Sequence, residues 1–224
     1  MIVIPEQVED KLSSFIHKMK DRTFIVFDFE TNGFFPKASA LSLSAQKIRI
    51  ISKNSYEVIE KIDRYYYPKE DEAYQEEAIK VNGLDKPTVD KKRGLDCEYP
   101  REFKQDSYFY RMCKGCNSYI GHNLEYDLKG VLWLKPSEIN IFDTMMDNVD
   151  VVKKPNQNGY SGYGWPKLIE TVNHYNLPID QDKLHESFYD VEQTLAIFMK
   201  MIEYSNIRIL PDDRELKALL RRGR

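Results

Sequence analysis

The spacing of hydrophobic residues changes along the chain, and each change predicts a different element. In residues 5–20 the apolar side chains recur at helical spacing, which predicts an amphipathic helix within an N-terminal segment, residues 1–22. Residues 23–28 are a short apolar run that ends in an acid, a pattern typical of a buried strand. Two strand-like stretches follow at 40–51 and 57–67, with turn-forming residues between them. We expect these three strands to form an antiparallel meander.

The rest of the chain alternates between helical and strand patterns. Residues 85–101 are charged and irregular, which indicates a surface insertion, and residues 153–164 lack an apolar period, which indicates a mobile loop. Further elements are expected as helices at 71–81, 103–114, 124–134, 166–175 and 187–204, and as short strands at 118–120 and 139–142. This order predicts one α/β domain over residues 23–204, followed by a basic tail, residues 205–224. Its three layers would be a central mixed sheet, an antiparallel meander plus parallel strands, flanked by helices.

Composition excludes several classes of protein. The 224 residues are 42% hydrophobic and 31% charged, which excludes a disordered chain. The mean hydropathy is -0.59, and no apolar run approaches the roughly 20 residues of a membrane span. The net charge of -3 argues against a uniformly basic nucleic-acid coat but leaves room for a local basic groove. With three cysteines there is no disulfide framework, so we expect a soluble, cytoplasmic (intracellular) protein that does not bind membranes.

Four acidic residues stand where the structural pattern alone does not require them. Asp28 ends the first apolar strand and Glu30 follows two residues later, so both carboxylates share a face of an extended chain. Asp127 lies at a turn from a short strand into a helix, and Asp190 lies on the last long helix, five residues after His185. Converging carboxylates repel one another, and Mg²⁺ or Mn²⁺ bound by oxygen ligands relieves that repulsion. Two such ions can activate a water and stabilise a leaving oxygen in a phosphodiester displacement.

Three segments around these acids resemble a known set of motifs. The segments D-F-E-T-N-G-F (28–34), G-H-N-L-E-Y-D (121–127) and H-E-S-F-Y-D (185–190) resemble, in this order, the motifs of the DEDDh 3′–5′ exonucleases. That family includes proofreading subunits, RNase T and oligoribonucleases. The resemblance covers residues 23–204. It implies an RNase H-like fold and a metal-dependent enzyme that removes nucleoside 5′-monophosphates from 3′ ends.

The resemblance also implies a role for each matching residue. Two Mg²⁺ or Mn²⁺ ions would be held by the four acids, Asp28, Glu30, Asp127 and Asp190. His185 would be the general base, a role that suits the near-neutral pKa of histidine. Substrate contacts would come from Thr31 and Gly33 at the terminal nucleotide, Phe34 as a wedge against the last base, and Asn123 in support of the second motif. Ser187 replaces the alanine of the family pattern and could add a hydrogen bond near His185.

Alternatives remain open at this point. The expected partner is a nucleic acid with a free 3′ end, DNA or RNA and by expectation single-stranded, and no feature names a protein partner. An RNA-trimming or oligoribonuclease-like enzyme would share the motifs. A catalytically weak nucleic-acid-binding subunit of a larger polymerase or CRISPR adaptation complex is a second alternative. Cys97, Cys113 and Cys116, with His122 close by in sequence, could bind zinc, although reduced and partly buried thiols are the simpler interpretation.

Overall fold

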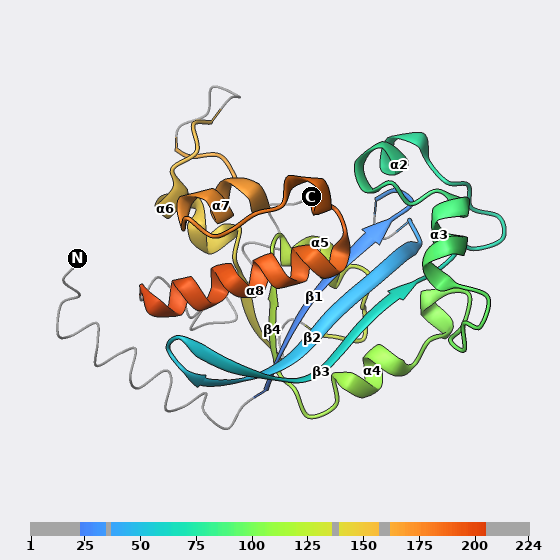
Figure 1. Ribbon diagram of the computed structural model, residues 1–224, viewed down its shortest axis with the longest axis horizontal. Coiled ribbons are helices and arrows are strands. Elements are labelled where there is room, and N and C mark those ends of the chain that lie inside the picture. The colour runs from blue at the N-terminus through green and yellow to red at the C-terminus, as the bar shows by residue number, and fades with distance from the viewer. Residues whose placement is uncertain (1–22, 35–36, 136–138, 157–161, 205–224) are drawn as a thin grey trace.

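A single five-stranded sheet forms the centre of the protein (Figure 1). The computed structural model describes residues 23–34, 37–135, 139–156 and 162–204. The strand order is β3-β2-β1-β4-β5, with bounds β1 (Thr23–Thr31), β2 (Ala40–Ser52), β3 (Ser55–Tyr65), β4 (Ser118–Gly121) and β5 (Asn140–Asp143). Strands β1, β2 and β3 pair antiparallel, whereas β4 lies parallel to both β1 and β5. The predicted mixed sheet is therefore confirmed, while the predicted N-terminal helix and basic tail lie outside the described residues.

Helices cover both faces of this sheet. The long helix α8 packs across β1, β2 and β4 on one face, and the short helix α4 contributes to the core on the other face (Figure 1). The α-helices are α2 (Glu76–Asn82), α3 (Lys86–Arg93), α4 (Tyr108–Met112), α5 (Leu124–Leu128), α6 (Val149–Val152), α7 (Leu168–His174) and α8 (Ser187–Glu203). The 3₁₀ turns are η1 (Phe103–Gln105), η3 (Met146–Asn148) and η4 (Gln181–Lys183). Among the described residues, none of these helices has the length and apolar character needed to cross a bilayer.

Strand β1 is buried on both faces, which explains its nearly continuous apolar sequence. Ile25, Phe27 and Phe29 point into the core on the α4 side, and Phe24 and Val26 point into the core on the α8 side. Each fully buried aromatic or aliphatic side chain contributes about 1.5–3 kcal/mol. This packing makes β1 the most firmly held strand on which a functional residue could stand.

The acids of β1 face the helix α8. Asp28 and Glu30 continue the series of Phe24 and Val26, because side chains two apart share a face of a strand. In the neighbouring strand β2, Ser44 lies opposite Asp28 and Ser42 lies opposite Glu30. The apolar core on this face therefore ends in a polar patch below the N-terminal end of α8.

The segment 85–101 contains a helix that the charge pattern did not predict. Helix α3 begins at Asp85, whose carboxylate accepts a hydrogen bond from the Thr88 backbone N–H at 2.8 Å, and it ends at Gly94 in the left-handed region. The prediction of an irregular segment was wrong because only Val89 of this helix is buried, so its apolar period is weak. The capping residues carried the signal instead.

Other predicted helices are shorter in the structure. The predicted helix 103–114 is divided into η1 and α4, because the Asp106 carboxylate accepts from the Tyr108 backbone N–H at 2.8 Å and starts a new helix there. The predicted helix 124–134 ends at Leu128 and continues as tighter turns with hydrogen bonds three residues apart. The predicted helix 71–81 forms only in its second half. These differences leave the predicted order of elements intact.

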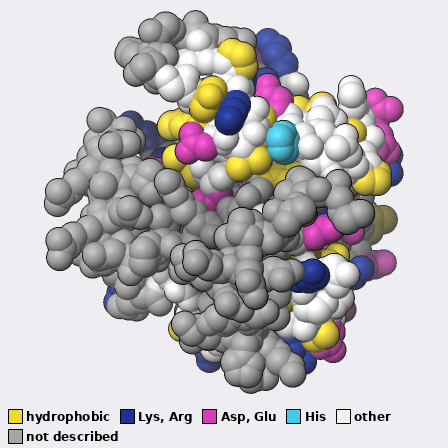
Figure 2. All heavy atoms as spheres, turned by 90° about the vertical axis from the view of Figure 1, so that its left-hand side faces the viewer, with side chains coloured by type: hydrophobic (Ala, Val, Ile, Leu, Met, Phe, Trp, Pro, Cys, Tyr) yellow, Lys and Arg dark blue, Asp and Glu magenta, His cyan; other side chains and the backbone are white. Residues whose placement is uncertain are grey.

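Charges of both signs are mixed on the surface. On the face shown in Figure 2, acidic and basic side chains of the described residues are interspersed with hydrophobic and other side chains. This distribution agrees with the net charge of -3 and with the expectation that the chain is not uniformly basic.

Candidate active site

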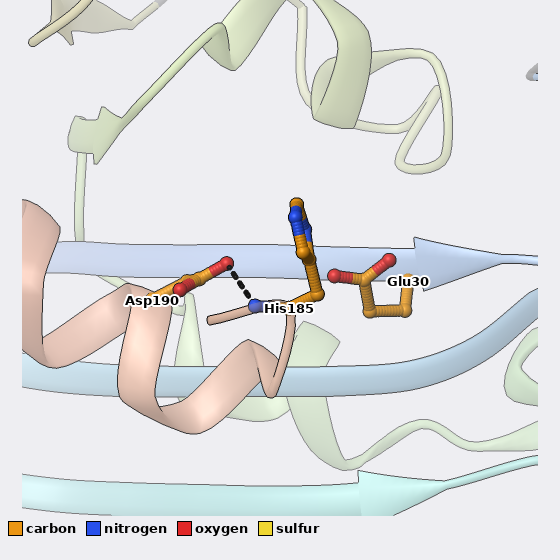
Figure 3. A group of neighbouring side chains, drawn as sticks. All are labelled: Glu30, His185 and Asp190. Carbon is orange, nitrogen blue, oxygen red and sulfur yellow. Dashed lines mark hydrogen bonds between the residues drawn. The ribbon is translucent and has the colours of Figure 1, made fainter. Parts of the chain in front are cut away.

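Three residues from two distant parts of the sequence form a compact group (Figure 3). Glu30 lies on β1, His185 directly precedes α8, and Asp190 lies in the first turn of α8; one ligand atom from each lies within 4.8 Å of the others. The His185 backbone N–H donates to Asp190 Oδ2 at 3.2 Å, and Figure 3 shows the imidazole between the two carboxylates. The first and third sequence motifs are therefore brought together.

The other two acids belong to the same group. Asp127 on α5 is buried and accepts a hydrogen bond from the Phe29 backbone N–H at 3.3 Å, which attaches it to β1 beside Asp28. The pKa of Asp28 is raised well above its ordinary value, first by burial and then by the charges of Asp127, Glu30 and Asp190. The structure thus places all four predicted acids within one another's electric field.

The raised pKa values of Glu30 and Asp190 show that the ionised forms of these carboxyl groups are disfavoured in this site. Burial, and then the charge of Asp190, raise the pKa of Glu30 to about 8, although a hydrogen bond with Asn82 partly offsets them. Burial likewise raises the pKa of Asp190 to about 7, although the His185 backbone N–H partly offsets the effect. Without a cation, both carboxyl groups would therefore hold protons near neutral pH. A divalent cation would reverse these shifts.

The donor set fits a hard divalent metal ion. Asp190 Oδ1 is buried and has no hydrogen-bond partner among the described residues, so a ligand oxygen is available there. The charges that act most strongly on these carboxylates are other carboxylates. Carboxylate oxygens are the ligands that Mg²⁺ and Mn²⁺ prefer. The residues present therefore fit the two ions that the motifs imply.

His185 has an uncommon backbone conformation. Its φ angle is 69°, in the left-handed region, where a residue other than glycine costs on the order of 1–3 kcal/mol. Burial, and then the positive charge of Lys167, lower the pKa of the imidazole. His185 is therefore neutral near neutral pH and can accept a proton. Strain of this kind is often retained where it positions a functional group.

Ser187 fixes the start of α8 on the sheet. Its buried hydroxyl lies 3.0 Å from the Ser42 hydroxyl and 2.7 Å from the Ser44 hydroxyl, both on β2. The Ser44 hydroxyl also donates to Asp63 at 2.7 Å. The hydrogen bond that the sequence suggested near His185 is therefore made to β2 instead, and it holds the helix that carries Asp190.

Three predicted substrate residues lie at the end of β1. The Thr31 side chain is buried, and its hydroxyl lies 2.7 Å from the Tyr126 hydroxyl, which in turn donates to the Gly33 carbonyl at 2.9 Å. The Gln75 side chain packs closely on Gly33: a Cβ there would lie 2.7 Å from the Gln75 amide nitrogen, so any side chain would displace the end of Gln75. Phe34 is 82% exposed. Thr31 and Gly33 are thus held rigidly, while the Phe34 ring is free to contact a ligand.

Asp143 is a residue of this site that the sequence analysis missed. At the end of β5 it accepts hydrogen bonds from the backbone N–H groups of Asn123 at 3.0 Å and Leu124 at 2.9 Å, and from those of Met145 and Met146 at 2.9 and 3.2 Å. It therefore caps α5 from a different strand, since Asn123 itself has φ 69° and makes no side-chain cap bond. An acid directly after a predicted strand, as at Asp28, was the available signal.

Asn82 is a second residue that was missed. At the end of α2 its side-chain amide donates to the Thr31 carbonyl at 3.0 Å, and it also hydrogen-bonds Glu30. The sequence indicated only a helix end at Asn82 and Gly83. No local sequence pattern predicts the contact of Asn82 with Thr31 and Glu30, because the contact depends on where α2 packs.

The cysteines do not form a zinc site in the part of the chain that the structure describes. Cys113 and Cys116 are buried, Cys97 is partly buried, and all three are free thiols. The His122 ring is hydrogen-bonded to the Pro166 carbonyl at 3.1 Å, and burial lowers its pKa to about 4. Among the described residues, Glu30, His185 and Asp190 are the group with metal-binding geometry. The three thiols and the His122 ring therefore do not come together as a metal-binding group among the described residues, and the thiol interpretation stays a prediction.

The mixed sheet, with acids at the end of β1, on α5 and on α8, defines the class of RNase H-like nucleases. A family model described as "Exonuclease" (RNase_T) matches residues 25–198. The chain therefore belongs to the RNase T exonuclease family, and it is a nuclease by this membership. No curated protein sequence matches the chain.

Solved structures share this fold at low sequence identity. The nuclease domain of 3′hExo, a DEDDh family member bound to rAMP, is 13% identical with a TM-score of 0.58, covering 84% of this chain and 95% of that one. Cell-death related nuclease 4 (CRN-4) is 12% identical with a TM-score of 0.57, and the match covers 84% of this chain and 66% of CRN-4. E. coli Exonuclease I in complex with a dT13 oligonucleotide is 16% identical with a TM-score of 0.54, and the match covers 81% of this chain and 41% of Exonuclease I. The chain thus spans less than half of Exonuclease I. The predicted DEDDh resemblance and RNase H-like fold are confirmed.

Proposed function

We propose that this protein is a 3′–5′ exonuclease that hydrolyses the terminal phosphodiester bond of a nucleic acid and releases nucleoside 5′-monophosphates. The observation that carries the proposal is the compact group of Glu30, His185 and Asp190 beside Asp28 and Asp127, in which Asp190 Oδ1 is buried and has no hydrogen-bond partner among the described residues. Two of the similar structures support a nucleic-acid substrate: Exonuclease I in complex with dT13, and a 3′-exonuclease that recognises the histone mRNA stem-loop.

Asp28, Glu30, Asp127 and Asp190 would hold two Mg²⁺ or Mn²⁺ ions. When bound, such a pair supplies an activated water and stabilises the leaving oxygen. The chain itself fixes the ligands relative to the sheet, because Asp127 is bonded to β1 and Ser187, at the start of the helix that carries Asp190, is bonded to β2. This rigidity keeps the carboxylates together despite their mutual repulsion.

His185 would take the proton of the attacking water on a ring nitrogen. Its lowered pKa keeps the imidazole neutral and able to accept a proton near neutral pH. The bond from its backbone N–H to Asp190 leaves the ring free for this task. His185 is therefore oriented by its backbone rather than by a second side chain.

The end of β1 would bind the terminal nucleotide. The exposed ring of Phe34 offers a face on which the last base can stack, and Gly33 permits close approach of the chain beside it. Thr31 supports this turn through Tyr126, and Asn123 supports α5 through its backbone contact with Asp143.

Matched oligonucleotides labelled at the 3′ or the 5′ end test the proposal. Single- and double-stranded DNA and RNA are incubated with Mg²⁺ or Mn²⁺, with and without EDTA. We expect shortening from the 3′ end, release of nucleoside 5′-monophosphates, loss of activity in EDTA, and protection by a 3′-phosphate. Cleavage of circular single strands, or shortening from the 5′ end, would overturn the proposal. The relative rates on RNA and DNA decide whether the enzyme is an RNA-trimming one.

A further inference from the structure

A second cavity lies beside the proposed site, on the α4 side of the sheet. Its volume is about 240 Å³, and Ala38, Ser39 and Ala40, beside the end of β1, form part of its lining. Ala40 in its wall pairs with Thr31, and the Ala38 backbone N–H donates to the Phe34 carbonyl at 3.2 Å. A strand bound at Phe34 would therefore reach this cavity by crossing one turn of the protein.

The cavity combines an aromatic wall with free basic groups. Trp133 is 40% exposed, and its ring meets that of Tyr110 edge-on, with centroids 5.1 Å apart. Lys104 and Lys129 in the lining are exposed; among the described residues Lys104 makes no ion pair, and Lys129 makes only a loose one, at 3.7 Å to Glu125. Base stacking on aromatic rings together with lysine contacts to phosphate is how proteins hold single strands.

The acids of the lining do not cancel this charge. Asp106 is already bound by Arg64 at 2.5 Å, which leaves Glu102 as the acid without such a partner. Lys69 is engaged by Glu72 at 2.6 Å, so Lys104 and Lys129 are the amines available to a ligand. Two such lysines against one such acid leave the lining with a positive charge, which favours a phosphate-bearing ligand over a cationic or purely apolar one.

We propose that this cavity binds an upstream nucleotide of the strand whose 3′ end lies in the carboxylate site, with its base against Trp133 and Tyr110 and a phosphate at Lys104 and Lys129. The inference rests on the proposed function. It adds a second contact that lets the protein prefer strands over single nucleotides. Binding at two places along one strand also makes affinity dependent on length.

The test removes the two lysines and compares two substrates. The double variant Lys104→Ala/Lys129→Ala is measured on a deoxythymidine octanucleotide and on the p-nitrophenyl ester of thymidine 5′-monophosphate, which has no upstream nucleotide. A matched control removes two lysines elsewhere, Lys53→Ala/Lys200→Ala, from the β2–β3 turn and the end of α8 farthest from Asp190. Circular dichroism checks that all variants are folded.

We expect the octanucleotide KM of the Lys104/Lys129 variant to rise about tenfold or more, the scale of one lost hydrogen bond to a charged group. Its kcat, and both constants for the p-nitrophenyl ester, should match wild type. The salt dependence of octanucleotide binding should weaken by about 0.7 in slope, the value for the one phosphate contact that the two lysines share. The Lys53/Lys200 control variant should keep the wild-type ratio of the two KM values, octanucleotide to p-nitrophenyl ester. Its salt dependence of octanucleotide binding should change by less than that of the Lys104/Lys129 variant.

A direct reading of the cavity comes from tryptophan fluorescence. The chain has two tryptophans, so a Trp165→Phe background leaves Trp133 as the reporter. We expect the octanucleotide to quench Trp133 in this protein without added metal ion, and the Lys104/Lys129 substitutions to weaken the quenching. Thymidine 5′-monophosphate at the same concentration should quench much less.

Three results would overturn the inference. They are an unchanged octanucleotide KM in the Lys104/Lys129 variant, an equal loss of activity on both substrates, or quenching of Trp133 that is the same with and without the two lysines. An enzyme that degrades oligonucleotides while showing any of these retains the proposed function and loses only the second nucleotide site. A wild-type protein that cleaves neither substrate refutes the proposed function. The fluorescence arm then still decides whether the cavity binds a strand.

Discussion

Asp106 and Asp190 are both largely buried carboxylates, but their surroundings differ in charge. Asp106 accepts hydrogen bonds from Arg64 at 2.5 Å, from the Tyr66 hydroxyl at 2.9 Å and from the Tyr108 backbone N–H at 2.8 Å. Burial alone would raise its pKa, but these bonds outweigh burial and the pKa is lowered. The carboxylate of Asp106 is therefore stable as an anion.

Asp190 lacks such a partner. One oxygen accepts only from the His185 backbone N–H, the other has no partner among the described residues, and burial raises the pKa to about 7. The fold thus pairs the structural acid Asp106 with a cation, whereas among the described residues none of the four converging acids forms an ion pair. This difference separates a structural acid from a candidate metal ligand more sharply than burial does.

The largest expected effect follows from removing an unpartnered acid. In Asp190→Asn we expect nuclease activity to fall about 10³-fold or more, because a metal pair supplies several kcal/mol to the transition state. The metal-free variant should keep its fold and melt at a higher temperature than wild type. Single-turnover rates at saturating Mg²⁺, with melting curves, measure both. Activity within tenfold of wild type would place Asp190 outside the metal site.

The next effect concerns the base. We expect His185→Gln to lose about 10²-fold in rate while binding Mn²⁺ as wild type does. Because burial lowers the pKa of His185, the wild-type rate at saturating metal should rise with pH to an inflection below the ordinary value of 6.5 and then level off. Rates from about pH 5 to 9 for both proteins test this. An inflection that persists in the glutamine variant belongs to another group.

The opposite outcome is expected for the structural acid. Asp106→Asn should lower the free energy of unfolding by about 3 kcal/mol, because it leaves Arg64 without its buried partner. The kcat per folded molecule should stay unchanged. Urea unfolding and active-site-normalised rates separate the two quantities. A large loss of kcat with normal stability would remove the distinction between the two kinds of acid.

A smaller effect is expected at Asp143, which holds α5 rather than a ligand. Both carboxylate oxygens of Asp143 accept backbone N–H groups, so the amide of Asp143→Asn would meet a donor at one position. We expect a loss of about 1–3 kcal/mol in stability and a weaker apparent affinity for Mg²⁺, since Asp127 is less well placed. Asp150→Asn, which changes an exposed acid on α6, is the control. Equal Mg²⁺ requirements in the two variants would contradict this.

A further effect, on stability alone, is a pH dependence of the metal-free protein. The raised pKa values mean that Glu30, about 8 against an ordinary 4.5, and Asp190, about 7 against 3.8, bind protons more tightly when folded than when unfolded. Their contribution is therefore complete below the ordinary values and is lost as the pH rises through 7 to 8. For a chain of this size, each kcal/mol lowers Tm by about 2–4 °C. Melting curves in EDTA should show this fall, and Asp190→Asn should reduce it.

Strand patterns predicted more of this molecule than helix patterns did. Strand β1 is buried on both faces, so its apolar run and its terminal acids are visible in the sequence. Helix α3 buries only Val89, so its apolar period is weak and its caps went unrecognised. Helices that pack through one or two residues leave little periodicity to detect.

The site was predictable where its residues stand in motifs and not where they act across the fold. Asp28, Glu30, Asp127, His185 and Asp190 were named from the order of three segments, and the structure brings them together. Asn82 and Asp143 act through backbone groups of distant elements, and such contacts exist only after the elements pack. The catalytic roles of the named residues stay predictions.

Calorimetric titration of the metal-free protein with Mn²⁺ at neutral pH, repeated in buffers of different ionisation enthalpy, tests the central claim most directly. Because Glu30 and Asp190 hold protons when no cation is present, binding should release protons, and the buffer dependence counts them. We predict that each chain binds two Mn²⁺ ions and releases protons. The number of ions bound and the number of protons released should both fall in Asp190→Asn and should both stay unchanged in Asp106→Asn. No binding, or binding unaffected by Asp190→Asn, would contradict the account.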